Sequence, residues 1–255
     1  MLLQGKKALI FGILNDKSIA WAIAQAFKQH GAELAITYVG EAQEKRVRPL
    51  AESLNTDLVF PCDVRKDNEI RAVFRELAKR WDGLDIIIHA VAFADKEELK
   101  GTILNTSRVG FAMAMDISVY SFIAIMKEAE PFMRGRNSAA LTLSYYGAIK
   151  VFPNYNVMGV AKAALESSVR YLAEAVGPQG IRVNAISAGP IRTLSAMGVN
   201  GFRQILSQTE KKAPLRCNIA QEDVAGAAVY LCSDMSRGVA GEVHYVDAGY
   251  NVIGV

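Results

Sequence analysis

Cysteine is scarce in this chain of 255 residues, and its three cysteines lie far apart in the sequence, at Cys62, Cys217 and Cys232. An odd number of unclustered cysteines without a Cys-x-x-Cys spacing argues against both a disulfide framework and a zinc site. We therefore expect reduced thiols in or near the core and no metal centre.

Long apolar runs are also missing, because no uncharged apolar stretch reaches the roughly 18 residues that a membrane span requires. The N-terminal segment MLLQGKKALIFG lacks the hydrophobic region of a secretory signal, and its apolar run follows lysines as a buried strand would. These absences predict a cytoplasmic protein that does not bind a membrane.

Charge of one sign is not in excess either, since 29 Lys and Arg face 26 Asp and Glu, for a net charge of +3. Such a balance, without a basic helix, argues against nucleic acid as a partner. A hydrophobic content of 51% indicates a globular chain. The length suits one α/β domain, and no repeat or linker divides residues 1–255.

Short apolar runs alternate with longer helical patterns along the chain. Strands are expected at KALIFG, AELAITYV, DLVFPCDV and LDIIIHAVAF, and later at 139–144, 182–187 and 243–246; helices are expected between them, including 107–133, a helix containing Tyr155 and Lys162 that runs to about 176, and 221–231. Runs such as Ile86 to Ile88 are apolar throughout, as in parallel strands covered on both faces. The pattern predicts a doubly wound parallel sheet of the Rossmann type with helices on both faces.

Glycines and one irregular stretch complete this pattern. Left-handed helix ends are expected at Gly31, Gly83, Gly180 and Gly241, each between a helical pattern and the next strand. Residues 189–213 are the least regular part of the chain and follow a strand end. In this architecture a substrate lid belongs there.

A phosphate site should follow the first strand, where a helix N-terminus offers free N–H groups to anions. The sequence there has Gly12 alone instead of a Gly-x-Gly-x-x-Gly fingerprint, with Ser18 as the expected N-cap. The second strand ends at Tyr38 and Val39 without an arginine for a 2′-phosphate, which favours NADH over NADPH. Asp63 and Val64 could bracket adenine, and residues 89–92 could support the ribose and nicotinamide.

Tyr155 and Lys162 are seven residues apart, and Tyr145 precedes them by ten. Seven residues turn a helix through roughly 700°, which would place the Tyr155 and Lys162 side chains on one helix face. A phenol and an ammonium are the groups that a hydride-transfer site needs, one for a developing oxyanion and one for the hydroxyls of a cofactor. Together with the sheet, they indicate a nicotinamide reductase.

These features in this order resemble the bacterial NADH-dependent enoyl-acyl-carrier-protein reductases, a divergent branch of the short-chain dehydrogenases/reductases. The resemblance runs essentially end to end and is carried by DKSIAW (16–21), MDIS (115–118), YSF (120–122), LSYY (143–146), PNYNVMG (153–159), RVNAISAGPIRT (182–193) and GEVHYVD (241–247). Common members of the superfamily have Tyr-x3-Lys, whereas only Tyr-x6-Lys fits this chain.

The resemblance implies roles for individual residues. Tyr155 would hydrogen-bond the thioester carbonyl, Lys162 would hold the nicotinamide ribose, and Tyr145 would line the acyl pocket with Ala94 and Met158. The implied cofactor contacts are Gly12, Ser18, Ile19, Val39, Asp63, Val64, Val91, Lys162, Ile191, Thr193 and Ser195. The family is usually tetrameric, and burial of the apolar residues 252–255 in a subunit interface would be more favourable than their exposure to water. A homotetramer is therefore expected. Met158 and Phe93 could equally be core residues.

Several positions depart from the usual family pattern. Val39 stands where a glutamine is common, so adenine affinity could rest more on Asp63, and Ala92 replaces a frequent glycine beside the nicotinamide. Of the basic cluster that faces the acidic carrier protein, only Arg203 matches, beside neutral Asn200 and Gln204. A coenzyme A thioester therefore remains an alternative substrate.

Two alternative functions also remain open. One is a short-chain carbonyl or alcohol oxidoreductase, and the other is a non-catalytic NAD(H)-binding sensor.

Overall fold

The computed structural model describes residues 1–194, 196–198 and 201–254, and its centre is a parallel sheet of the strand order β3-β2-β1-β4-β5-β6-β7. The strands are β1 (Lys7–Phe11), β2 (Glu33–Tyr38), β3 (Val59–Pro61), β4 (Ile86–His89), β5 (Ser138–Ser144), β6 (Ile181–Ala188) and β7 (Val243–Val246). Each lies within two residues of a predicted strand or inside it. The predicted doubly wound parallel sheet is confirmed.

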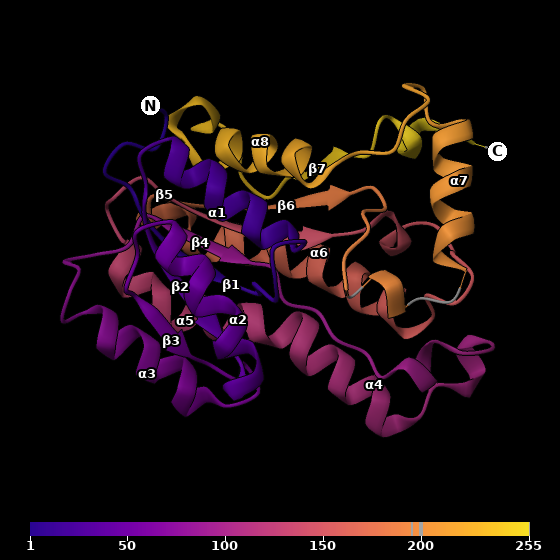
Figure 1. Cartoon of the computed structure of the whole chain (residues 1–255), viewed down its shortest axis with the longest axis horizontal. Helices are drawn as coiled ribbons and strands as arrows, with labels where there is room; N and C mark the ends of the chain where they lie inside the picture. Colours follow the sequence, from indigo (N-terminus) through magenta and orange to yellow (C-terminus); the bar gives the residue numbers. More distant parts are fainter. Residues whose placement is uncertain (195, 199–200, 255) are drawn as a thin grey trace.

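Helices connect the strands and cover the sheet (Figure 1). They are α1 (Ile19–Gln29), α2 (Gly40–Ser53), α3 (Asp67–Leu77), α4 (Arg108–Met115), α5 (Ser121–Met133), α6 (Val157–Val176), α7 (Phe202–Lys212) and α8 (Gln221–Cys232), besides short 3-10 turns. Alternate residues of β1 face opposite layers: Ala8 and Ile10 pack in one core with α1 and α8, and Leu9 and Phe11 in another with α3, α5 and α6. Because both faces are covered, the strands are continuously apolar.

The strand order creates a crevice where β1 and β4 lie side by side. The helix after β1 covers one face of the sheet, and the long helix that follows β4 covers the other. The connections therefore diverge at the carboxyl ends of these two strands, which is where ligands bind in open α/β sheets.

The long helix predicted over 107–133 is present, but a π-helical turn at Asp116–Tyr120 separates α4 from α5. Ser121 Oγ donates to the carbonyl oxygen of Ile117 at 2.6 Å, four residues back. A π turn leaves carbonyl groups without their usual helical partner, and such turns are frequent at functional sites. Sequence periodicity did not predict it.

By length and composition alone, the continuous helix Arg108–Met133 could cross a membrane, with a mean hydropathy of 1.8. The sequence, which has no uncharged apolar run of that length, predicts no such segment. Half of the most apolar window of this helix is buried inside the molecule, and Ile125, Met126 and Ala129 pack in the core beneath the sheet. That packing is typical of a core helix.

Tyr155 lies outside α6, and the prediction that it shares a helix with Lys162 is wrong. The helix begins at Val157, and Asn156 before it has φ 38° and ψ −118°, which no helical residue adopts. Asn154 also has a positive φ, of 63°. Two asparagines tolerate this strained turn better than most residues would, so the spacing of seven residues does not reflect helical periodicity.

Two smaller predictions also fail. Gly31, Gly180 and Gly241 have the expected positive φ, but Gly83 does not; the nearest atoms to a side chain there belong to the flexible side chain of Arg136. All three cysteines are free, yet Cys217 is exposed while Cys62 and Cys232 are buried. Cys217 follows Arg216, whose left-handed backbone holds it in a surface turn.

The segment 189–213 is more regular than its sequence pattern suggested, because it contains the eleven-residue helix α7. In Figure 1, α7 stands apart from the sheet, on the side where β6 ends. Leu206 and Thr209 are its buried residues, and the rest of the helix is mostly exposed. The mixed pattern therefore reflects a helix with a narrow apolar stripe.

Gly12→Ala should destabilise the protein strongly. Gly12 has a φ of +102°, and a Cβ there would overlap the backbone carbonyl of Ala90. Strain and overlap together should cost about 2 kcal/mol or more in the free energy of unfolding, measured by denaturant titration. Gly226→Ala is the control, because Gly226 lies within α8 with open space around it and should gain about 0.5–1 kcal/mol. An unchanged midpoint for Gly12→Ala would show that the turn after β1 accommodates a side chain.

Candidate active site

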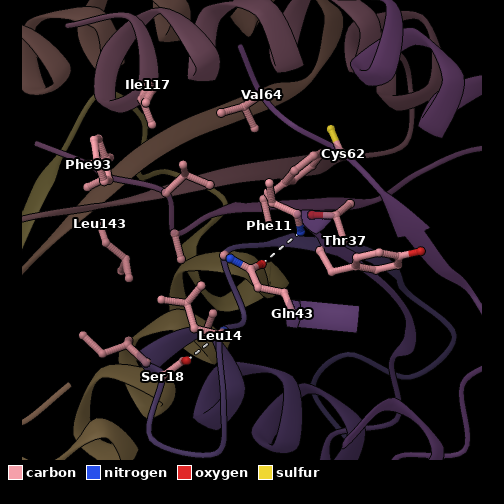
Figure 2. Close-up of a pocket in the computed structure, with 18 of the residues that line it drawn as sticks. Phe11, Leu14, Ser18, Thr37, Gln43, Cys62, Val64, Phe93, Ile117 and Leu143 are labelled. Atoms are coloured by element: carbon pink, nitrogen blue, oxygen red, sulfur yellow. Dashed lines mark hydrogen bonds between the residues drawn. The ribbon is translucent and has the colours of Figure 1, made fainter. Parts of the chain in front are cut away.

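A cavity of about 610 Å³ occupies the crevice at the carboxyl ends of β1 and β4. Its wall contains residues from the first four strand ends and from the helix after β4, together with Leu143, Ser144, Lys162, Thr193 and Leu194. Figure 2 shows the apolar side chains of Phe93, Ile117 and Val64 on one side of this cavity and Leu14 and Ser18 on the other. The cavity therefore extends from the end of β2 to the first turns of α6.

One end of the cavity is formed by the end of β2, with Tyr38 and Val39, and by Gln43. The Gln43 side chain accepts a hydrogen bond from the backbone N–H of Val39 at 2.9 Å, as the dashed line in Figure 2 shows. A carboxamide from the first turn of α2 therefore lies at this end of the cavity, next to Val39. The sequence signal for this contact is that Gln43 follows Val39, the N-cap residue of α2, by four residues.

Two arginines near this end are each paired with a carboxylate. Arg48 packs over the Tyr38 ring, with its guanidinium carbon 5.8 Å from the ring centroid, and forms an ion pair with Glu44. Arg65 binds both carboxylate oxygens of Asp63, with N–O distances of 3.0 Å to Oδ1 and 2.6 Å to Oδ2. Hydrogen bonds from Arg65 hold the pKa of Asp63 below its usual range. Neither guanidinium is therefore left as an unpaired cation for a phosphate.

The middle of the cavity lies at the turn from β1 into α1. Gly12 exposes its backbone there, because a side chain would overlap Ala90. Ser18 occupies the N-cap position as predicted, but its hydroxyl oxygen accepts from the backbone N–H groups of Leu14 and Asn15, at 3.0 and 3.1 Å. The hydroxyl holds the loop, and the first N–H groups of α1 stay available to an anion.

Lys162 lies at the other end of the cavity, on the first turns of α6. Its side chain is 6% exposed, and its ammonium donates to the carbonyl oxygen of Leu143 at 2.6 Å. Burial lowers the pKa of Lys162 to about 8, and the negative charge of Glu166 opposes the shift. The end of β5 therefore directs one ammonium into the cavity wall.

Tyr155 lies beside Tyr145, with ring centroids 5.0 Å apart in an edge-to-face arrangement. Gly147 permits this contact, because a Cβ there would overlap the Tyr155 ring. Burial raises the pKa of Tyr155, and so do nearby Tyr145 and Glu166; burial also raises the pKa of Tyr145. A phenol held protonated in this way can donate a hydrogen bond but does not carry charge.

Ala94, Met158 and Tyr155 meet in a small apolar cluster outside the main cavity. Ser118 of the π turn joins them: its hydroxyl oxygen accepts from the Phe93 N–H at 3.1 Å, and its hydroxyl lies 4.0 Å from the Met158 sulfur. Phe93 is 46% exposed and lines the cavity, so the alternative that it is a core residue is wrong. Met158 is buried at 6%.

His89 at the end of β4 is fully buried and holds strands and helix together. Its two ring nitrogens lie 2.8 Å from Thr142 Oγ1 and 2.8 Å from Ser121 Oγ. Burial lowers the pKa of His89 to about 3, and the charge of Lys162 adds to the shift. The imidazole is therefore neutral, and the cavity wall after β4 is formed by Ala90, Val91 and Ala92.

The structure brings most of the predicted residues together. The cavity wall includes the predicted cofactor residues Gly12, Ser18, Ile19, Val39, Asp63, Val64, Val91, Lys162 and Thr193. Ile191 packs instead against the core beside β6, and Ser195 lies outside the described residues. Tyr145, Tyr155, Ala94 and Met158 form a second group, off the cavity wall but next to one another.

Sequence reasoning missed some residues of the wall and its support. Gln43, Arg65 and Ser144 line the cavity, and Glu166 receives a hydrogen bond from Ser144 Oγ at 2.5 Å. Arg65 could have been found from its position two residues after Asp63. A glutamate four residues after Lys162 was a visible signal for Glu166.

A parallel sheet with a crevice at its switch point, a glycine turn facing a helix N-terminus and a buried lysine in the cavity wall define a dinucleotide-binding oxidoreductase. Comparison with known proteins specifies the family. The model of the family described as "Enoyl-(Acyl carrier protein) reductase" matches residues 12–251. The chain belongs to this family.

Curated and solved relatives agree. The enoyl-[acyl-carrier-protein] reductase [NADH] of Aquifex aeolicus is 53% identical over 100% of this chain and 94% of its own length. Its crystal structure matches with a TM-score of 0.98, at 100% coverage of both chains. A crystal structure of the reductase from Anaplasma phagocytophilum in complex with NAD matches at 54% identity and a TM-score of 0.96, covering 100% of this chain and 97% of that one. The predicted family and NADH dependence are confirmed.

Glu44→Gln should improve NADPH binding relative to NADH. The substitution removes the carboxylate that pairs with Arg48 beside Tyr38, which leaves a guanidinium free for a 2′-phosphate. The expected gain in the affinity ratio is small, roughly two- to fivefold, as is usual for one exposed charge. Fluorescence titration with both cofactors measures it. Glu52→Gln, an exposed change at the other end of α2, should leave the ratio unchanged; equal ratios in both variants would show that Glu44 does not restrain Arg48.

Proposed function

We propose that this protein reduces trans-2-enoyl thioesters of an acyl carrier protein with NADH, the last step of each cycle of fatty acid elongation. The observation that carries the proposal is the placement of Lys162 in the cavity wall, with Tyr155 and Tyr145 paired edge to face beyond it. Membership of the reductase family supports the same reaction.

The residues of the cavity fit a dinucleotide. Gly12 and the start of α1 suit the pyrophosphate, Asp63 and Val64 suit the adenine, and Ile19, Val39, Val91 and Thr193 of the same wall are proposed as further contacts. Ile191 and Ser195 are proposed as contacts on the family resemblance alone. NADH, when bound, supplies the hydride that adds to C3 of the enoyl thioester. The ammonium of Lys162 would hold the ribose hydroxyls and orient the ring beside Ala92.

Tyr155 would act on the substrate oxygen. As C3 is reduced, negative charge collects on the thioester carbonyl oxygen, and C2 is then protonated. A protonated phenol donates a hydrogen bond to that oxygen, and the raised pKa of Tyr155 keeps the phenol protonated. Tyr145, Ala94 and Met158 would line the acyl chain, since they lie around the Tyr155 ring.

Segment 189–213 is proposed as a lid over this site within one domain of residues 1–255. Its helix α7 and the following turn contain Arg203, Lys211, Lys212 and Arg216 against a single acidic residue, Glu210. An acidic carrier protein would be attracted there, although Gln204 is neutral and Asn200 lies outside the described residues. A cytoplasmic location fits this role.

The reaction is tested by the loss of NADH absorbance with trans-2-enoyl thioesters of carrier protein and of coenzyme A, with NADPH and ketones as controls. Tyr155→Phe should lower kcat by roughly 10² to 10³, the usual cost of one oxyanion donor. Lys162→Ala should instead weaken NADH binding by roughly tenfold or more, because it removes charged hydrogen bonds. Turnover of ketones alone, or two variants without effect, would refute these roles.

A homotetramer is proposed as the assembly. The adjoining helices α4, α5 and α6 expose Val109, Phe111, Ile123, Val160 and Tyr171, and β7 forms one edge of the sheet. Apolar patches of this kind usually mark interfaces. Two distinct surfaces, each joined through its own two-fold axis, generate a closed tetramer, and Val252, which is 71% exposed in the single chain, would be covered in such an assembly.

Light scattering should therefore give a mass of four times 27.7 kDa. Tyr171→Glu places a charge on the helical surface, where Tyr171 is 78% exposed, and should reduce the mass by half. Val151→Glu, on a loop side chain that is 97% exposed, should leave the tetramer intact. A monomeric mass for the unaltered protein would exclude this assembly.

A further inference from the structure

Behind the cavity wall, Lys162 and Glu166 lie four residues apart on α6, and each is only 6% exposed. Side chains at this spacing share one face of a helix, with Cβ atoms about 6 Å apart. The two are therefore an ammonium and a carboxyl group in the same buried layer, between α6 and the end of β5.

Two consecutive residues of β5 hold this pair. The Leu143 carbonyl accepts from the Lys162 ammonium at 2.6 Å, and the Ser144 hydroxyl donates to the Glu166 carboxylate at 2.5 Å. Leu143, Ser144 and Lys162 all line the cavity. Glu166 is thus fixed one layer behind the wall where the nicotinamide end of the cofactor is expected.

The other charged or titratable groups near the pair cannot replace this carboxylate. Neutral His89 of β4 and the protonated phenols of Tyr145 and Tyr155 carry no negative charge. Tyr245 of β7, which lies near Glu166, likewise has a raised pKa, and the cation Arg170, one turn beyond Glu166, is exposed. Among Glu166 and these five neighbouring groups, Glu166 alone supplies a negative charge that favours the charged form of Lys162.

We propose that Glu166 is a positioning residue for the reduction: its buried carboxylate, held by Ser144, keeps the Lys162 ammonium charged and directed into the cavity. The inference rests on the proposed function of Lys162 in holding the ribose. Burial lowers the pKa of Lys162, and the Glu166 charge opposes that loss. Burial also raises the pKa of Glu166, and the hydrogen bond from Ser144 opposes that rise by favouring the carboxylate. Without Glu166 the lysine would be neutral over more of the working pH range and would hold the cofactor less firmly.

The test is the NADH dissociation constant, measured by fluorescence at pH values on both sides of 8. In the unaltered protein, affinity should fall as pH rises through the Lys162 pKa of about 8. Glu166→Gln keeps the shape of the side chain but removes its charge, so the fall should begin about one to two pH units lower. Affinity at low pH, where Lys162 is protonated in both proteins, should be nearly unchanged.

Three further variants separate charge from packing. Glu166→Asp retains the charge, so NADH affinity should begin to fall near the same pH as in the unaltered protein. Ser144→Ala removes the hydrogen bond to the carboxylate and should lower the pH at which affinity begins to fall, by less than Glu166→Gln does. Glu174→Gln, on an exposed residue of the same helix, should change nothing. If Glu166→Gln does not fold, Ser144→Ala still decides the direction of the shift.

A curve for Glu166→Gln that superimposes on that of the unaltered protein would overturn the proposal, as would an equal loss of affinity at every pH, which indicates a structural role only. Enoyl thioester turnover is measured in parallel on the unaltered protein. Its absence, with NADH binding intact, would count against the proposed function and would leave the Glu166 curves interpretable.

Discussion

The close approach of Gly12 to the Ala90 carbonyl is the contact on which the rest of the site depends. It lets the chain leave β1 beside the end of β4 and enter α1 without a side chain in between. The N-terminus of α1, the end of β2 and the wall after β4 therefore face one cavity. A bulkier residue would push the two strand ends apart and close off the place where a pyrophosphate meets the helix.

The electrostatics of the site follow from what each strand end presents. Near β2 and β3 the guanidinium groups of Arg48 and Arg65 are already paired with the carboxylates of Glu44 and Asp63. Near β5 the Lys162 ammonium is buried in the cavity wall, and the Glu166 carboxylate lies behind it. The two ends of the crevice therefore hold their charges differently: near β2 and β3 by arginine–carboxylate ion pairs, and near β5 by hydrogen bonds to two consecutive residues of that strand.

Much of this could be predicted from the sequence, because continuous apolar strands such as Ile86 to Ile88 and helix-period patterns determine a doubly wound sheet. The residues of the cavity wall followed from their places at strand ends, as Gly12 and Asp63 show. The spacing of Tyr155 from Lys162 predicts a shared helix, and this prediction is wrong because Asn156, with its positive φ, precedes the helix. The π turn and the support from Glu166 depend on tertiary hydrogen bonds that no local pattern encodes.

Pro61 at the end of β3 limits how the sheet can grow. The strand has three residues, and its proline lacks a backbone donor, so this edge is a poor template for a further strand. Strand addition is left to the opposite edge, at β7. A sheet that can extend at one edge alone is complete once two copies have met, whereas two open edges would allow an endless fibre. One proline thereby makes any association through the sheet finite.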